Sequence, residues 1–111
     1  MKNYKIAIEQ LSKMYVIYEK IEGFESEKTA KICMELGQIY ELSENFSDAI
    51  EYYKNSYTIW EKVVKDDEYE VLFTLATKLA ELYEKSENYN NSYEILKSVH
   101  NIFKLIFHLF Y

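Results

Sequence analysis

The chain contains no proline and no arginine, and its 111 residues include only two glycines and one cysteine. Without arginine it lacks the planar guanidinium group that dominates contacts with nucleic-acid bases and phosphates. Nineteen acidic residues against 13 basic ones give a net charge of −6, which also disfavours an anionic membrane surface. We therefore expect neither a nucleic-acid-binding protein nor a basic membrane anchor.

The single cysteine, Cys33, cannot form a disulfide within the chain. Helical spacing places it on the same face as Leu36, Gly37 and Tyr40, and so we expect a buried thiol. The opening residues do not have the pattern of a secretory signal peptide. Together these features predict a cytoplasmic protein, with a peripheral position on endomembranes as an alternative.

Patterns typical of catalysis or metal binding are scarce. His100 and His108 are the only histidines, and their neighbours are apolar, whereas a metal site needs further ligands and a polar shell. No glycine-rich phosphate loop or nucleophile motif occurs. Carboxylates lie four residues from lysines, as in Glu9 with Lys13, which predicts ion pairs on a solvated helix face rather than acid–base chemistry. The second such pair is Glu81 with Lys85. We expect no catalytic residues, metal or cofactor, and hence no enzyme.

What the sequence does contain is an internal repeat. Residues 36–46 (LGQIYELSENF) return 43 positions later as residues 79–89 (LAELYEKSENY). A partial copy, residues 4–20, matches residues 46–62 at a spacing of 42. Self-similarity at a fixed period of this length indicates stacked helical hairpins rather than one closed globule.

Apolar residues recur three and four positions apart, and no segment alternates strictly, which predicts an all-α protein of about five antiparallel helices. The predicted helices cover residues 2–21, 27–43, from 45 or 47 to 64, from 68 to 86, and from 88 towards the end. The predicted turns contain Gly23 and Phe24, Asn45, Asp66 and Asp67, and Asn88. The chain is predicted to be one domain, 1–111, made of a half repeat (2–22) and two repeats (26–64 and 68–108).

Both full repeats follow the tetratricopeptide (TPR) pattern, in which a leucine and a small residue precede a tyrosine, and another small residue begins the second helix. The first copy has Leu36, Gly37, Tyr40, Ala49, Tyr53 and Ser56, and the second has Leu79, Ala80, Tyr83, Ser92, Leu96 and Val99. We expect Gly37 and Ala80 to admit a close partner helix, against which Ala49 and Ser92 fit. Phe46 and Tyr89 are expected to fill the gaps between hairpins. The pattern predicts a right-handed α-α superhelix.

A wider set of residues resembles the central part of the SNAP family, the soluble NSF attachment proteins. The matching residues are 7–13, 17–18, 23–24, 29–31, 39–41, 48–50, 52, 83 and 87–89. The resemblance implies a cytosolic adaptor that lies along a SNARE four-helix bundle and helps the ATPase NSF to disassemble it during vesicle fusion and transport. It also implies that inner lysines meet the acidic SNARE surface. Lys31 matches one such position, whereas the next repeat has Thr74 there, with Lys78 one turn later.

In stacked hairpins, partners bind to the inner face, which the first helix of each hairpin forms. By repeat position this face should carry Lys31, Met34, Gln38, Glu41, Thr74, Thr77, Lys78, Glu81 and Glu84. Met34 and Gln38 stand where a clamp for chaperone C-terminal carboxylates would have lysine and asparagine, which weighs against that class. The sequence predicts a SNAP-like adaptor, with a generic TPR scaffold such as a kinesin-light-chain-like cargo adaptor as the alternative.

The most apolar segment is residues 102–111, which is shorter than the ~20 residues that a membrane span requires. Three interpretations stay open: a cap over the last hairpin, an oligomer contact and a membrane-surface anchor. Because the first and last helices both leave apolar faces without a partner helix, we predict self-association, which sedimentation would test.

Overall fold

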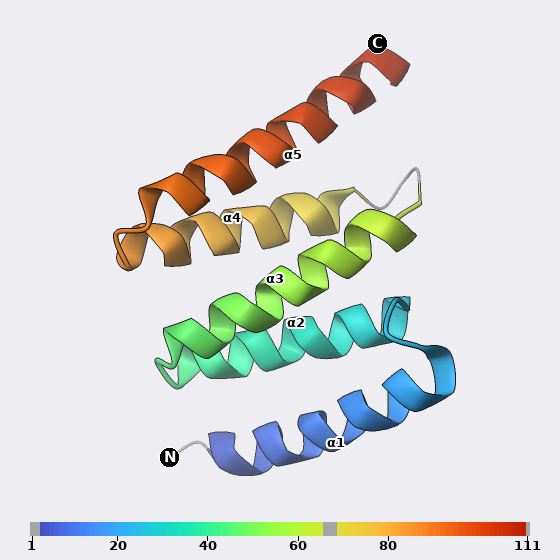
Figure 1. The fold of residues 1–111 in the computed structure, drawn as a ribbon, viewed down its shortest axis with the longest axis vertical. Coiled ribbons are helices and arrows are strands. Elements are labelled where there is room, and N and C mark those ends of the chain that lie inside the picture. Colours follow the sequence, from blue (N-terminus) through green and yellow to red (C-terminus); the bar gives the residue numbers. More distant parts are fainter. Residues whose placement is uncertain (1–2, 66–68, 111) are drawn as a thin grey trace.

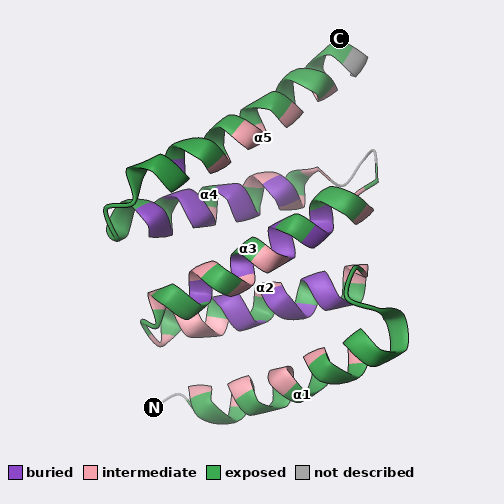
Figure 2. Cartoon of the chain, viewed as in Figure 1, coloured by how far each residue is buried: buried purple, intermediate pink, exposed green. Residues whose placement is uncertain are grey.

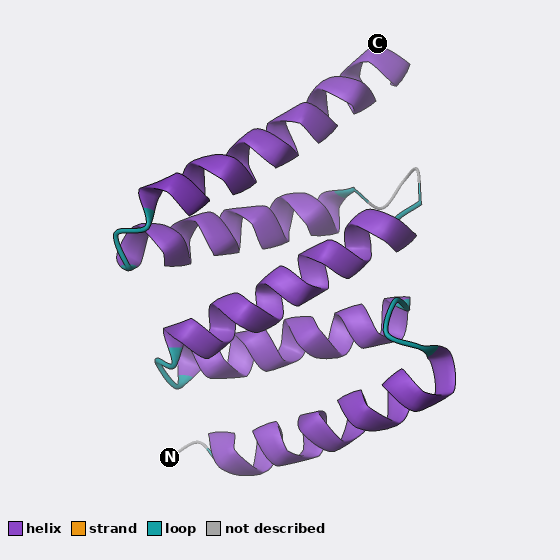
Figure 3. Cartoon of the chain, in the orientation of Figure 1, coloured by secondary structure: helices purple, strands orange, loops and turns teal. Residues whose placement is uncertain are grey.

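The structure is a computed structural model that describes residues 3–65 and 69–110, and these residues form five helices without a strand (Figures 1 and 3). The helices are α1 (Tyr4–Glu22), α2 (Glu27–Leu42), α3 (Phe46–Val63), α4 (Glu70–Lys85) and α5 (Tyr89–Phe110). The prediction of an all-α protein is confirmed, and the predicted helix bounds agree within about two residues. The turn predicted at Asp66 and Asp67 lies outside the described residues.

The helices stack in chain order instead of surrounding one centre. Each helix packs against its neighbours in sequence, and within the described ranges no other pair of helices brings Cα atoms within 8 Å. The molecule is correspondingly flat, with extents of 46 × 36 × 21 Å. Figure 1 shows α2 and α4 behind α3 and α5, so the helices form two layers. This is the arrangement of stacked hairpins that the repeat predicts.

Local signals explain where the helices begin and end. Ser26 caps α2, because its Oγ accepts a hydrogen bond from the Thr29 backbone N–H at 3.1 Å. Asn45 precedes α3 as predicted, but its side chain makes no capping bond. The turns predicted at Asn45 and Asn88 have their left-handed residues one position earlier, at Glu44 (φ 63°) and Glu87 (φ 59°). This is the Schellman ending, in which a backbone N–H bonds back to a carbonyl five residues earlier.

Most core residues belong to α2, α3 and α4, where Figure 2 shows the buried positions. Its largest fully buried side chains include Leu36, Tyr53, Ile59, Leu72, Leu75, Leu79 and Leu82. By contrast, α1 contains no buried residue. Cys33 is buried as predicted, and burial raises the pKa of its thiol to about 12. The end helices therefore cover the core from either side with one half-buried face each.

Small residues bring neighbouring helices together, partly as expected. A Cβ atom added at Gly37 would lie 2.7 Å from Cδ1 of Tyr53, so Gly37 admits the Tyr53 ring. The second pair behaves as predicted, because the Ser92 Oγ donates to the Ala80 carbonyl at 3.3 Å. The close approach of α2 and α3 thus depends on one glycine facing one aromatic ring.

Two sequence predictions about aromatic and charged residues are wrong. Phe46 is half-buried beneath the Lys85 ammonium, whose Nζ lies 5.3 Å from the ring centroid, but Tyr89 is 64% exposed. Tyr89 has nothing to fill because no described helix follows α5. The pairs predicted for Glu9 with Lys13 and for Glu81 with Lys85 are not among the ion pairs of the described residues. Lys85 turns to Phe46 instead.

The end helices expose apolar side chains. On α1 these include Ile6, Val16, Ile17 and Ile21, and on α5 they include Leu96, Phe103, Leu105 and Phe107. Val99 and Ile102 of α5 pack against the core. The role of residues 102–111 stays open among the three interpretations. Self-association through the remaining apolar surface stays a prediction.

Alkaline pH is expected to destabilise the fold through its buried and half-buried tyrosines. Burial is the main cause that raises the pKa of Tyr15 to about 12, and it also raises the pKa values of Tyr52, Tyr57 and Tyr83. These hydroxyls ionise near pH 10 in the unfolded chain. Stability is therefore fully present below about pH 10 and is lost as the pH rises towards 12. Urea-unfolding midpoints from pH 8 to 11.5 measure this loss.

The Tyr15→Phe variant is the control for this prediction, because it removes one of the shifted hydroxyls. Its midpoint should fall less steeply than that of the parent protein. A parent midpoint that stays constant up to pH 11.5 would contradict the expected linkage.

Candidate functional site

The predicted binding residues lie on α2 and α4, and we call the side of the molecule that they form the α2/α4 face. Lys31 and Gln38 are exposed on α2, where Met34 and Glu41 are half-buried. On α4 the exposed residues are Thr74, Thr77, Glu81 and Glu84, and Lys78 is half-buried. Two adjoining pockets occupy this face and share Thr74. The face is therefore hollowed across both repeats.

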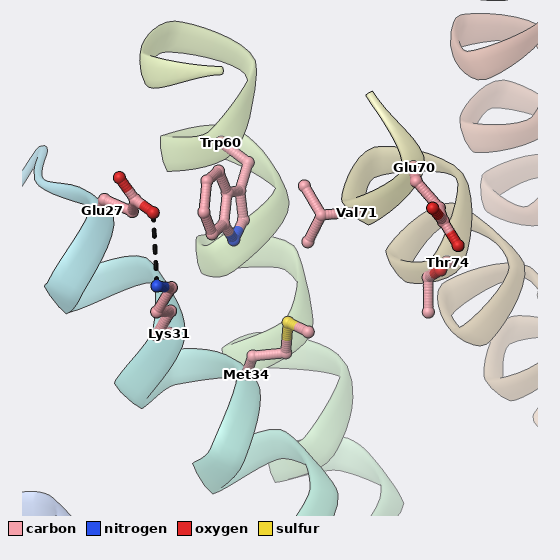
Figure 4. A pocket seen from close by; sticks show the side chains of 7 residues that line it. All are labelled: Glu27, Lys31, Met34, Trp60, Glu70, Val71 and Thr74. Atoms are coloured by element: carbon pink, nitrogen blue, oxygen red, sulfur yellow. Dashed lines mark ion pairs between the residues drawn. The ribbon is translucent and has the colours of Figure 1, made fainter. Parts of the chain in front are cut away.

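The larger pocket, which we call the Trp60 pocket, has a volume of about 450 Å³ and lies between α2, α3 and α4 (Figure 4). Its lining residues are Glu27, Lys31, Met34, Trp60, Glu70, Val71 and Thr74. Trp60 is only 3% exposed. At the edge, Lys31 Nζ lies 3.2 Å from Glu27 Oε1. The pocket thus combines apolar side chains with a charged rim.

The smaller pocket, of about 370 Å³, follows α4. Its lining residues are Phe73, Thr74, Thr77, Lys78 and Glu81, and four of these are predicted site residues. Threonine hydroxyls, a lysine and a carboxylate border one aromatic ring here. Thr77 Oγ1 donates to the Phe73 carbonyl at 2.8 Å, so this hydroxyl hydrogen is already used within α4.

One predicted binding residue, Glu41, is already engaged within the protein. Tyr53 Oη donates to its Oε1 at 2.8 Å, and Lys78 Nζ lies 3.5 Å from its Oε2. Burial, followed by this hydrogen bond, raises the pKa of Tyr53. Glu41 therefore links α2 to Tyr53 of α3 and to Lys78 of α4. Gln38 and Glu84 are exposed but line neither pocket.

The charges of the face do not balance. Both of its lysines have a carboxylate partner, Lys31 with Glu27 and Lys78 with Glu41. Glu70 and Glu81 make no ion pair with any residue that the structure describes. Pairs this exposed stabilise by only ~0–1 kcal/mol, but they do neutralise the lysines locally. The face presents net negative charge to a partner.

Sequence reasoning missed five pocket residues: Glu27, Trp60, Glu70, Val71 and Phe73. One signal could have found two of them, because Glu27 and Glu70 are 43 positions apart and occupy the same place in each repeat. Trp60 gave no such signal, since its counterpart in the second repeat is Phe103. Only packing reveals that Trp60 of α3 reaches a pocket between α2 and α4.

The remaining chemistry of the chain is sparse. His100 and His108 are exposed on α5. Within residues 3–65 and 69–110, no three His, Cys, Asp or Glu side chains gather as metal ligands would. No helix in the same ranges has both the length and the apolarity to cross a bilayer.

Comparison with known proteins identifies the fold. No family model and no curated protein matches the sequence. Among solved structures, the chain is similar to a crystal structure of nearly identical TPR-like repeats assigned to a kinesin light chain of Podosopora anserina, with a TM-score of 0.74 and 21% sequence identity. The match covers 89% of this chain and 46% of that one, so the chain spans less than half the length of that structure. The chain is a TPR-like array of helical hairpins.

Proposed function

We propose that this protein is a non-catalytic scaffold that binds a segment of a partner protein along the α2/α4 face. The observation that carries the proposal is that the Trp60 pocket crosses from α2 of one repeat to α4 of the next, and that the smaller pocket continues it along α4 from Thr74. A hollow shared by successive repeats suits an extended guest, and repeat arrays bind their guests on such surfaces. The pocket side chains are apolar groups, threonines and ions, which suits recognition better than catalysis.

A general TPR scaffold, such as a cargo adaptor like kinesin light chain, is the class that these observations favour. The TPR-like fold supports it without requiring a particular partner. A SNAP-like adaptor acting on SNARE proteins with NSF has its support in the sequence resemblance. It would need inner lysines to meet an acidic surface, and Lys31 and Lys78 are instead paired with glutamates.

Site-specific photo-crosslinking tests the proposed function. p-Benzoylphenylalanine would replace Gln38 or Thr77 on the face, and Thr58, an exposed residue of α3, as the matched control. Extracts of the source organism should yield discrete protein adducts from the first two positions and none from the third. Equal adducts from Thr58, or none from either face position, would refute the proposal. SNARE proteins among the adducts, lost in Lys31→Glu, would favour the SNAP-like adaptor.

A further inference from the structure

We propose that the Trp60 pocket is the anchoring subsite of this face, and that it takes a basic–aliphatic peptide segment whose main-chain carbonyl oxygen accepts a hydrogen bond from Trp60 Nε1. The inference rests on the proposed function and specifies the chemistry of the partner. It assigns three contacts: a carbonyl oxygen on the indole, an aliphatic side chain against Met34 and Val71, and a lysine or arginine beside Glu70.

The first reason is an unsatisfied donor. Trp60 Nε1 is enclosed by protein, yet it makes no hydrogen bond within the described residues, and it is the only buried side-chain nitrogen or oxygen there of which this is true. Buried indole N–H groups normally have a partner. Because no water fits beside the enclosed N–H group, an acceptor reaches it only when a neighbouring side chain such as half-buried Met34 turns aside. The acceptor then gains a hydrogen bond without a further desolvation cost for the indole.

The second reason is the direction of the indole. In Figure 4 the nitrogen edge of Trp60 points to the side on which Met34 and Val71 lie, towards the interior of the pocket. Met34 comes from α2 and Val71 from α4, so an aliphatic side chain placed between them would join the two repeats. The pocket volume of about 450 Å³ is ample for one such side chain and its peptide group.

The third reason is charge, which selects among acceptors. Glu27 and Glu70 both line the pocket, and Lys31 is held by Glu27 at 3.2 Å. A carboxylate ligand would enter a site with an excess of negative charge, whereas a neutral carbonyl would not be repelled. Glu70 has no ionic partner among the described residues and is free to pair with a cation. The partner is therefore cationic rather than acidic.

The repeat explains why one subsite anchors the segment. The position of Trp60 is taken in the second repeat by Phe103, whose side chain has no N–H group and which is 53% exposed on α5. The indole donor therefore occurs once along the face. It sets the register of the bound segment, and the smaller pocket extends the site from Thr74 towards Glu81.

A peptide library read by NMR tests the inference. The probe is a positional-scanning library of acetylated and amidated hexapeptides, each sublibrary having one fixed residue. Because Trp60 is the only tryptophan, ¹⁵N-labelled protein has a single indole N–H resonance. Sublibraries with fixed lysine or arginine, and those with fixed leucine, isoleucine or methionine, should bind at least ~10-fold more tightly than those with aspartate or glutamate. Binding should move the indole proton downfield.

Three variants assign the contacts. Glu70→Gln should weaken binding of the best basic peptide about 3- to 10-fold, and Glu70→Lys should turn the preference towards acidic peptides. Glu94→Gln, an exposed carboxylate of α5, is the matched control and should change nothing. Trp60→Phe removes the donor and should cost about 2- to 10-fold. Since Glu70 is exposed, its variants keep the test decisive even if Trp60→Phe disturbs folding.

Several outcomes would overturn the inference: no sublibrary binds, acidic peptides bind best, the indole resonance stays fixed during binding, or Glu70→Lys leaves the preference unchanged. These failures are distinguishable from failure of the proposed function. If crosslinking at Gln38 and Thr77 captures a partner while the library prefers acidic peptides, only the anchoring chemistry is wrong. If adducts form equally at Thr58, the α2/α4 face itself is not the binding surface.

Discussion

Replacing Leu79 by alanine is expected to lower the free energy of unfolding by about 2–5 kcal/mol, the range for truncating a buried leucine. Leu79 is 1% exposed and lies in the core cluster that joins α3 to α4. Truncation loses the burial of its side chain and leaves a cavity that packed neighbours cannot fill. Each helix of the stack rests on its sequence neighbours, so a defect in α4 weakens the supports of both α3 and α5.

Urea unfolding followed by far-ultraviolet circular dichroism measures this loss. Leu105→Ala is the control, because Leu105 is also in mid-helix but is 65% exposed on α5. It should cost less than about 1 kcal/mol, since little of its apolar surface is removed from water in the native state. Similar losses for the two variants would mean that the core does not lie where the structure places it.

Gly37→Ala is expected to destabilise the protein by a net of up to about 2 kcal/mol, although alanine is the better helix former by about 1 kcal/mol. The new Cβ atom would lie 2.7 Å from Cδ1 and 2.8 Å from Cε1 of Tyr53. The ring cannot yield easily, because Tyr53 is 1% exposed and its hydroxyl is bound to Glu41. Overpacking of this kind typically costs about 1–3 kcal/mol and outweighs the gain in propensity.

The second repeat suggests a second substitution that should remove the cost of Gly37→Ala. Where the first repeat has Gly37 with Tyr53, the second has Ala80 with Leu96 at the same positions. In a Tyr53→Leu background, Gly37→Ala should therefore become neutral or stabilise by up to about 1 kcal/mol. A double-mutant cycle from urea unfolding measures this change of sign. An equal cost in both backgrounds would show that the Tyr53 ring is not the obstacle.

Much of the fold follows from the sequence because the signals are local and occur twice. The 43-residue period and the helical spacing of apolar residues predict the five helices and their order. The repeat pattern also shows that Gly37 and Ala80 occupy the same position in the two repeats. Where a repeat position lacks its usual surroundings, the pattern misleads. Tyr89 matches Phe46 in sequence, but no described helix covers it.

The candidate site could be predicted less completely. Repeat position assigns Lys31, Met34, Thr74, Thr77, Lys78 and Glu81 to one face, and these six residues line its two pockets. Their role in binding stays a prediction. Repeat position does not predict that Glu41 neutralises Lys78, whereas Glu27 lies four residues before Lys31, a spacing at which an ion pair is expected. Lys78 and Glu41 are 37 residues apart in the chain. Their side chains meet only because the fold brings α2 and α4 together.

By itself, the sequence determined a stack of helical hairpins with a polar face made by the first helix of each repeat. It could do so because helix period, caps and repeat spacing act over a few residues. Only the tertiary structure decided that Lys78 is paired with Glu41 across that face, and that a buried indole N–H beside it has no partner among the described residues. Both depend on distances between side chains of different helices, which packing alone sets.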